Sequence, residues 1–195
     1  MRRNEAFFQR LYTNVSGEQL RIDVMNTIAK KRLLIVWHSR TGAAHQMALA
    51  AESGAQAIAA ELQAEHRLDI VVKQAAQVDA QDLLGADGFV FCAPENLASL
   101  SGAMKEFFDR NYYCALDQLN GRPYAIMISA GSDGSGAARQ TERICTGWRL
   151  RLIAPALIVN TDAQSPQAIT AAKTITDNDS AACETLGATL AALLL

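Results

Sequence analysis

The chain has 195 residues, of which 50% are hydrophobic and 19% charged, so it can form one domain with a full-sized core and is not disordered. A net charge of −2 without a block of one sign excludes a basic nucleic-acid surface and disfavours the acidic docking face of an electron carrier. No apolar run approaches the roughly 18 residues that span a membrane, and the opening residues lack the apolar segment of a secretory signal. We therefore expect a cytoplasmic globular protein that binds neither nucleic acid nor membrane.

The four cysteines and three histidines show no pattern of a disulfide framework or a metal site. Cys92, Cys114, Cys145 and Cys183 lie far apart, without a CxxC pair or a cluster with histidine. This usage is typical of reduced, mostly buried thiols in a cytosolic protein. We predict no metal site.

Residues 1–31 differ from the rest, because they hold six of the 18 basic residues and three acidic ones. Two interpretations stay open. Either Met25 is the true start and residues 1–24 are an upstream extension, or a short amphipathic helix through Phe7, Phe8 and Leu11 packs on the surface or on a partner subunit. We treat 1–31 as an N-terminal extension and 32–195 as the domain.

From residue 32 on, apolar runs alternate with helical stretches. The predicted strands are 33–37, 68–72, 88–92, 123–129 and 152–159, and the predicted helices are 42–64, 101–113, 137–148 and 179–195, with a helical turn at 81–84. This alternation predicts an α/β fold with a five-stranded parallel sheet in the doubly wound order 2-1-3-4-5, covered on both faces. Pro155 inside the last run favours an edge position for that strand.

In such a sheet a ligand binds at the carboxyl ends of the strands, so the loops that follow the strands decide the function. After the first strand, Ser39, Thr41 and Gly42 precede a long helix, whose free N–H groups and dipole suit a phosphate. The lysine of a triphosphate-binding loop is missing. The alternative is an ordinary helix cap by Ser or Thr. His38, beside this loop, either donates to the phosphate or is a capped or partly exposed histidine.

Two further loops lie at the same sheet edge. Residues 93–102 form a long loop led by a proline, for which the alternative is a plain turn with Ser101 as helix cap. Residues 130–136 hold three glycines and two serines, which suits a planar polar ligand, although a solvated surface loop has the same composition. Neither loop carries the GxGxxG dinucleotide fingerprint. Together, the three loops predict one ligand site.

These loops resemble those of a known family. The stretch Ser39-Arg40-Thr41-Gly42 resembles the phosphate loop of flavodoxins. Residues 85–110, GADGFVFCAPENLASLSGAMKEFFDR, resemble a segment of the flavin-dependent NAD(P)H oxidoreductases related to WrbA-type quinone reductases and NADPH-dependent FMN reductases. The resemblance covers residues 32–195 and implies a flavodoxin-like three-layer sandwich.

The same resemblance implies FMN as cofactor, NAD(P)H as co-substrate, and a quinone or similar small acceptor. The flavin carries the chemistry, so no catalytic side chain is expected. The implied cofactor-binding residues are Ser39, Arg40, Thr41, Gly42, Ala43 and Ala44 at the phosphate, Pro94, Glu95, Asn96 and Leu97 along the isoalloxazine ring, and Gly131, Ser132, Asp133 and Gly136 over its other edge. The family also implies a homo-oligomer, either a dimer or a tetramer.

The chain departs from the family pattern in both of the first two loops. Ala43 and Ala44 replace the Thr or Asn that ends the phosphate loop, Leu97 stands where an aromatic residue is common, and Ala98 replaces a glycine. A lost hydrogen bond to a charged group costs about 1.5–3 kcal/mol. Two alternatives therefore stay open: a flavodoxin-fold module that has lost or weakened FMN binding, and an electron-transfer flavodoxin.

Two other features allow two interpretations each. Arg139 and Arg143 lie four residues apart on a predicted helix and either grip the 2′-phosphate of NADPH or form a solvated face that pairs with Glu142 or with a partner subunit. The apolar tail 191–195 suits either a subunit contact or the end of a helix lying on the sheet.

Overall fold

The computed structural model describes residues 30–195, of which Lys31–Leu195 forms one unit. The alternative start at Met25 and the helix through Phe7, Phe8 and Leu11 lie outside the described residues, so both stay predictions. Lys31 already belongs to the first strand, one residue ahead of the predicted start of the domain.

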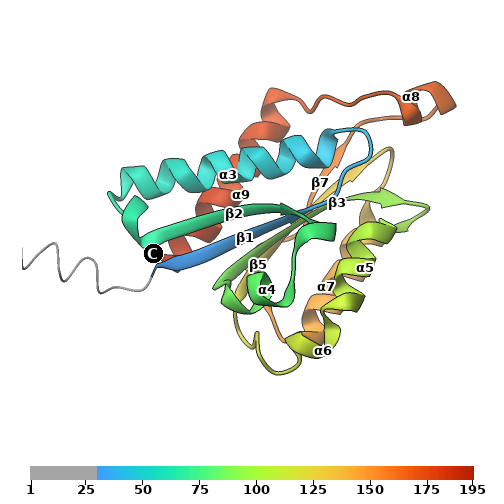
Figure 1. Cartoon of the computed structure of the whole chain (residues 1–195). Coiled ribbons are helices and arrows are strands. Elements are labelled where there is room, and N and C mark those ends of the chain that lie inside the picture. The colour runs from blue at the N-terminus through green and yellow to red at the C-terminus, as the bar shows by residue number, and fades with distance from the viewer. Residues whose placement is uncertain (1–29) are drawn as a thin grey trace, which may run out of the picture. The chain divides into compact units, whose positions relative to one another are not determined.

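A central sheet organises the described part of the chain (Figure 1). Its strands are β1 Lys31–Trp37, β2 Leu68–Gln74, β3 Gly88–Asn96, β4 Ser99–Leu100, β5 Pro123–Ala130, β6 Arg151–Leu152 and β7 Leu157–Asn160. β1 pairs in parallel with β2 and β3, β3 pairs with β5, and β5 pairs with both β6 and β7. The predicted parallel sheet in the order 2-1-3-4-5 is confirmed, with β6 and β7 sharing its fifth position.

Pro155 lies in the gap that divides the fifth strand. β6 pairs with the beginning of β5, and β7 pairs with its end. Proline has no N–H to donate to a ladder of hydrogen bonds, so pairing stops around this residue. The edge position that Pro155 favours is confirmed, and the single strand predicted for 152–159 is in fact two short ones.

Helices cover both faces of the sheet. They are α3 Ala43–Glu61, α4 Ala80–Gly85, α5 Gly102–Arg110, α6 Tyr112–Ala115, α7 Ser135–Gly147, α8 Pro166–Thr170 and α9 Asp177–Leu194, with 3-10 turns at Glu65–Arg67 and Ala75–Gln77. Figure 1 shows α3 and α9 on one side of the sheet, and α4, α5 and α7 on the other. The arrangement is a three-layer α/β sandwich.

The two core layers differ in the size of their side chains. Aromatic rings fill the layer beneath α5 and α7; they belong to Phe89, Phe91, Phe107, Phe108, Tyr124 and Trp148. On the other face, α3 contributes mainly alanines, and the side chains of Ala44, Ala48, Ala51 and Ala55 are buried there. Small side chains let a helix lie close to its neighbours, so α3 packs closely against the sheet and α9.

α3 and α9 cross at two glycines. A Cβ atom at Gly54 would lie 2.0 Å from the carbonyl oxygen of Glu184, and one at Gly187 would lie 2.0 Å from the carbonyl oxygen of Ala51. No side chain fits between the two backbones. The position of α3, including its N-terminus at the edge of the sheet, therefore depends on α9.

The apolar end of the chain lies on the sheet. Leu190 and Ala191 are buried, Leu194 and Leu195 pack against the same layer, and Leu193 is exposed. Of the two interpretations of residues 191–195, the structure agrees with the one in which they end a helix lying on the sheet.

Residues 93–102 form no open loop, contrary to the prediction. β3 continues to Asn96, turns at Leu97 and Ala98, and returns as β4, which pairs with it in antiparallel fashion. The single helix predicted for 101–113 is also two helices, α5 and α6, which meet at Asn111. The segment after β7, with α8, had no predicted structure. Among the described helices, none is both long and apolar enough to cross a membrane.

Candidate functional site

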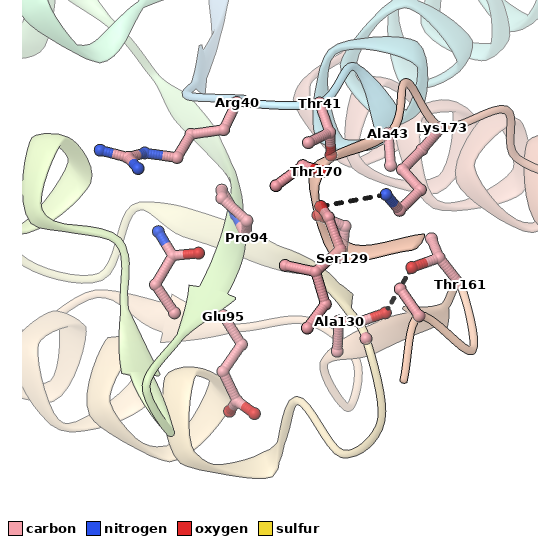
Figure 2. Close-up of a pocket in the computed structure, with 14 residues that line it drawn as sticks. Arg40, Thr41, Ala43, Pro94, Glu95, Ser129, Ala130, Thr161, Thr170 and Lys173 are labelled. Atoms are coloured by element: carbon pink, nitrogen blue, oxygen red, sulfur yellow. Dashed lines mark hydrogen bonds between the residues drawn. The ribbon is translucent and has the colours of Figure 1, made fainter. Parts of the chain in front are cut away.

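A cavity of about 350 Å³ lies at the carboxyl ends of β1, β3, β5 and β7 (Figure 2). This is the edge where the sequence places a ligand site. The residues that line it come from four segments of the chain; they are Arg40, Thr41, Ala43, Pro94, Glu95, Asn96, Ser129, Ala130, Gly131, Thr161, Ala163, Ile169, Thr170 and Lys173.

The N-terminus of α3 opens at this cavity without a side-chain cap. Gly42 occupies the N-cap position with φ 101°, in the left-handed region, and no side chain accepts a hydrogen bond from the first turn. The Ser39 hydroxyl accepts the N–H of Gly42 at 3.0 Å, one residue before the helix. The ordinary Ser or Thr cap weighed above is therefore wrong. The first N–H groups of α3 have no partner within the helix and, with its dipole, favour an anion.

The N-terminus of α7, on the other side of the cavity, is closed by a carboxylate. Its N-cap is Gly134, with φ 85°, and again no local side chain caps the helix. Instead, the two oxygens of Glu95 accept the N–H groups of Gly134 and Ala137, each at 2.9 Å. Glu95 thus binds the protein's own backbone at the place where the resemblance puts it along a flavin ring.

The β3–β4 hairpin is fixed to α7 by two further contacts. The Gln140 side-chain oxygen accepts the Ser99 hydroxyl and the N–H of Leu100, each at 2.7 Å. A Cβ atom at Gly136 would lie 2.2 Å from the carbonyl oxygen of Ala98, so only glycine lets the hairpin approach this closely. The second and third predicted loops therefore form one connected wall.

The segment after β7 supports the third loop. The N–H of Thr161 donates to the carbonyl oxygen of Ala130 at 2.8 Å, and the N–H of Ala163 donates to that of Gly131 at 3.0 Å. Asn160 donates from its side chain to the carbonyl oxygen of Ser132 at 2.5 Å. These bonds hold residues 130–132 in place, so this part of the loop has less freedom than its glycine content indicates.

The structure brings half of the predicted site residues together. Seven of them line the cavity: Arg40, Thr41, Ala43, Pro94, Glu95, Asn96 and Gly131. The other seven, Ser39, Gly42, Ala44, Leu97, Ser132, Asp133 and Gly136, lie beside it without lining it.

Those seven have identifiable positions. Ala44 is fully buried, and its carbonyl oxygen accepts the thiol of Cys92 at 3.0 Å. Leu97 is fully exposed at the tip of the hairpin, and Ser132 and Asp133 are also exposed. Gly136 packs on the hairpin instead of facing the cavity. In the residues that the structure describes, no group of His, Cys, Asp and Glu could hold a metal ion.

Sequence reasoning missed the other half of the lining. These residues are Ser129 and Ala130 at the end of β5 and Thr161, Ala163, Ile169, Thr170 and Lys173 after β7. Ser129 and Ala130 follow from the rule that strand ends line the site. The later residues carry no motif, and only the fifth strand's place in the sheet order pointed to them.

His38 and Cys92 are internal to the domain. The Nδ1 atom of His38 lies 2.8 Å from the hydroxyl of Ser101, the N-cap residue of α5, and its ring does not line the cavity. Burial, and to a smaller extent the charge of Arg40, lower the pKa of His38, so the ring is neutral near pH 7. Burial raises the pKa of the Cys92 thiol well above its ordinary value, as expected of an inert core cysteine.

A second, cationic groove of about 580 Å³ lies on the far side of the hairpin, between α5 and α7. Lys105, Arg139, Gln140 and Arg143 line it, together with Ala98, Gly136 and Ile144. Within residues 30–195, neither Arg139 nor Arg143 forms a salt bridge, so the predicted pairing with Glu142 is absent there. Lys105 is paired with Asp109.

Comparison with known proteins places this chain beside flavin-binding families. The family model for NADPH-dependent FMN reductase matches residues 38–164, which contain all three loops. A curated relative, a flavodoxin of Aquifex aeolicus (strain VF5), is 26% identical over 105 residues, or 54% of this chain and 53% of that protein. The chain thus spans about half the length of the curated relative it matches.

Several solved structures share the fold. A flavodoxin from the domain Archaea has a TM-score of 0.65 and 17% identity over 84% of this chain and 98% of its own. A flavodoxin, WrbA-like protein from Agrobacterium tumefaciens has a TM-score of 0.62 and 15% identity over 85% of this chain and 98% of its own. An oxidoreductase from Corynebacterium diphtheriae has a TM-score of 0.63 and 18% identity over 85% of this chain and 97% of its own. At these identities the likeness establishes the flavodoxin-like fold.

Proposed function

Because this chain belongs to the NADPH-dependent FMN reductase family, we propose that it binds FMN in the cavity at the strand ends and passes electrons from NAD(P)H to a quinone or similar small acceptor. One observation carries the proposal: α3 presents an uncapped N-terminus to that cavity. Such a helix end is a ready-made site for an anion, including a phosphate group. FMN, when bound, supplies hydride and electron chemistry that no side chain provides.

The cavity residues fit an FMN molecule in separate ways. Thr41, with the first N–H groups of α3, is positioned to bind the phosphate. Pro94, Asn96 and the backbone of Gly131 line the part of the cavity farther along the strand ends, where a flat ring would be held by packing and by backbone donors. The hairpin, which is fixed to α7 through Gln140 and Gly136, forms one wall of this space.

The cationic groove is the place we assign to the phosphate of the reduced nicotinamide nucleotide. Arg139 and Arg143 have no carboxylate partner in the described part of the chain, and a guanidinium matches phosphate geometry. The double variant Arg139→Gln/Arg143→Gln should raise the KM for NADPH about tenfold or more and change the KM for NADH much less. An equal change for both nucleotides would show that the groove does not bind the 2′-phosphate.

Two alternatives have an observation each in their favour. Ala43 is buried at the cavity and offers no side-chain donor, which favours a module with weakened FMN binding. The curated relative is named a flavodoxin, which favours an electron carrier. A carrier accepts electrons from a partner reductase, whereas the proposed enzyme accepts them directly from NAD(P)H.

The visible absorption spectrum during titration with FMN separates all three. The proposed function predicts bound-flavin bands that NADPH alone bleaches under anaerobic conditions. Bands that NADPH alone leaves unchanged would favour the carrier. A protein that does not perturb the spectrum of added FMN would overturn the proposal and leave a flavodoxin-fold module for another ligand.

A further inference from the structure

The segment from Thr161 to Thr176 contributes the wall of the cavity beside the N-terminus of α3. Ile169, Thr170 and Lys173 all line the cavity from this segment. The matched family region ends at residue 164, so these three residues lie beyond it. Figure 2 shows Lys173 next to Ala43 and Thr41, at the phosphate end of the proposed FMN site.

Three hydrogen bonds fix the backbone of Lys173 and Ile175 to the loop after β1 and the first turn of α3. Its backbone N–H donates to the carbonyl oxygen of Thr41 at 2.7 Å. The Gln46 side chain donates to the carbonyl oxygen of Lys173 at 2.6 Å and accepts the N–H of Ile175 at 3.2 Å. These bonds hold Lys173 beside the loop after β1, although it lies 127 positions beyond Gln46 in the sequence.

The ammonium group of Lys173 is oriented but not neutralised. It donates to the carbonyl oxygens of Ala168, of Ile169 at 3.2 Å and of Ala171 at 2.7 Å. These carbonyl groups carry no net charge, and within residues 30–195 Lys173 forms no salt bridge. A half-buried cation without a counter-ion, at the wall of a cavity, favours an anionic ligand there.

The other cation of the cavity is placed differently. Arg40 is exposed, and Figure 2 shows its side chain extending away from Lys173. Ala43 and Ala44 supply no hydroxyl or amide to the same end of the cavity. Lys173 therefore brings a cation to this cavity from the segment after β7.

We propose that Lys173 supplies positive charge to the phosphate of FMN at the place where Ala43 and Ala44 offer no side-chain donor. Its three N–H groups already donate to three carbonyl oxygens, so a direct contact requires that a phosphate oxygen replace one of these carbonyls. The inference rests on the proposed function, because it names a residue that completes the same site. It assigns phosphate recognition to two segments that are distant in sequence, the loop after β1 and the segment 161–176.

The test compares FMN with riboflavin, which has the same ring and no phosphate. The dissociation constants of both are measured by flavin fluorescence at low ionic strength for the wild type, Lys173→Met and Lys173→Arg. Lys31→Met is the matched control, because Lys31 is an exposed lysine at the start of β1 and lines neither the cavity nor the cationic groove. Lys173→Met should weaken FMN binding about tenfold or more, with riboflavin binding unchanged.

Two further results are expected. Lys173→Arg should retain most of the preference for FMN over riboflavin, and Lys31→Met should retain all of it. Added KCl should weaken FMN binding to the wild type more than to Lys173→Met. Salt screens the attraction between the Lys173 ammonium and the FMN phosphate, and the variant lacks this attraction.

Each contrary outcome has a separate meaning. If Lys173→Met leaves the preference for FMN unchanged, the inference is wrong and the proposed function stands. If it weakens FMN and riboflavin equally, Lys173 only holds the segment in place, which also overturns the inference. If the wild type binds neither flavin, the failure lies in the proposed function, and the inference falls with it.

Discussion

Two helices begin at the edges of the same cavity, and the protein treats their N-termini in opposite ways. Both α3 and α7 follow a buried strand, and both have a glycine with positive φ at the N-cap, Gly42 and Gly134. At α7 the free N–H groups are occupied by the carboxylate of Glu95. At α3 no side chain occupies them.

This difference teaches how one of two similar anion sites is selected. The fold alone supplies both helix ends with their dipoles, so geometry does not choose between them. The carboxylate of Glu95 fills one site with the protein's own charge, and a cation, Lys173, stands beside the other. An incoming phosphate thus meets repulsion at α7 and attraction at α3.

The largest effect should come from adding a methyl group at the two N-cap glycines. In Gly134→Ala the Cβ would lie 2.6 Å from Cγ2 of Ile158, in addition to its unfavourable φ, whereas in Gly42→Ala the nearest atoms are at 3.5 Å. We expect Gly134→Ala to lower the free energy of unfolding by about 2–5 kcal/mol and Gly42→Ala by about 1–2 kcal/mol. Denaturant unfolding of the flavin-free protein measures both, and equal losses would contradict the difference in space around the two glycines.

A smaller effect should follow when the charge at α7 is removed. Glu95→Ala loses two hydrogen bonds to a carboxylate and should lower the free energy of unfolding by about 1.5–3 kcal/mol. Glu95→Gln keeps an acceptor without the charge and should lose less. Removal of the carboxylate also opens α7, so sulfate should raise the melting temperature of Glu95→Ala more than that of Glu95→Gln or the wild type. If sulfate acts equally on all three, Glu95 does not block an anion site.

The smallest effect concerns α5, where the N-cap hydroxyl of Ser101 is engaged by His38. The pKa of His38 is lowered in the folded protein, so as the pH falls through 6.5 the unfolded chain binds the proton first and the folded state loses stability. Between pH 7.5 and 5.5 the wild type should lose more stability than His38→Asn, measured by thermal unfolding. An identical pH dependence of the two proteins would exclude this role.

Much of the fold could be predicted because its signals are local. The apolar runs at Leu33–Trp37 and Gly88–Cys92 became β1 and part of β3, and Pro155 marked the edge where the fifth strand divides. The order of the strands followed from their alternation with helices, since parallel strands require crossover connections.

The β3–β4 hairpin could not be predicted, because its turn lacks the residues that are typical of tight turns. Leu97 and Ala98 have φ of 53° and 56°, a region that turns of this kind usually fill with Asn and Gly. Contacts from a distant helix hold them there, through Gln140 and the space left by Gly136. Such contacts have no signature in the local sequence.

The site could be predicted only in part, because some of its residues follow strand ends and others are placed by contacts between distant segments. Thr41, Pro94 and Gly131 follow strand ends and could be found from the order of the sheet. Glu95 was predicted beside the ligand, but its bonds to α7 required the structure. Lys173 carries no motif, and its place depends on hydrogen bonds to Thr41 and Gln46, far away in the chain.

The crossing of α3 and α9 at Gly54 and Gly187 has a consequence for the order in which the protein is made. A ribosome produces the loop after β1 well before Lys173 and α9, the helix that positions α3. A nascent chain that stops before residue 161 has neither the wall of the cavity nor the support of α9, and one that stops before residue 177 still lacks α9. For the proposed FMN site, this order predicts that cofactor loading follows the synthesis of α9.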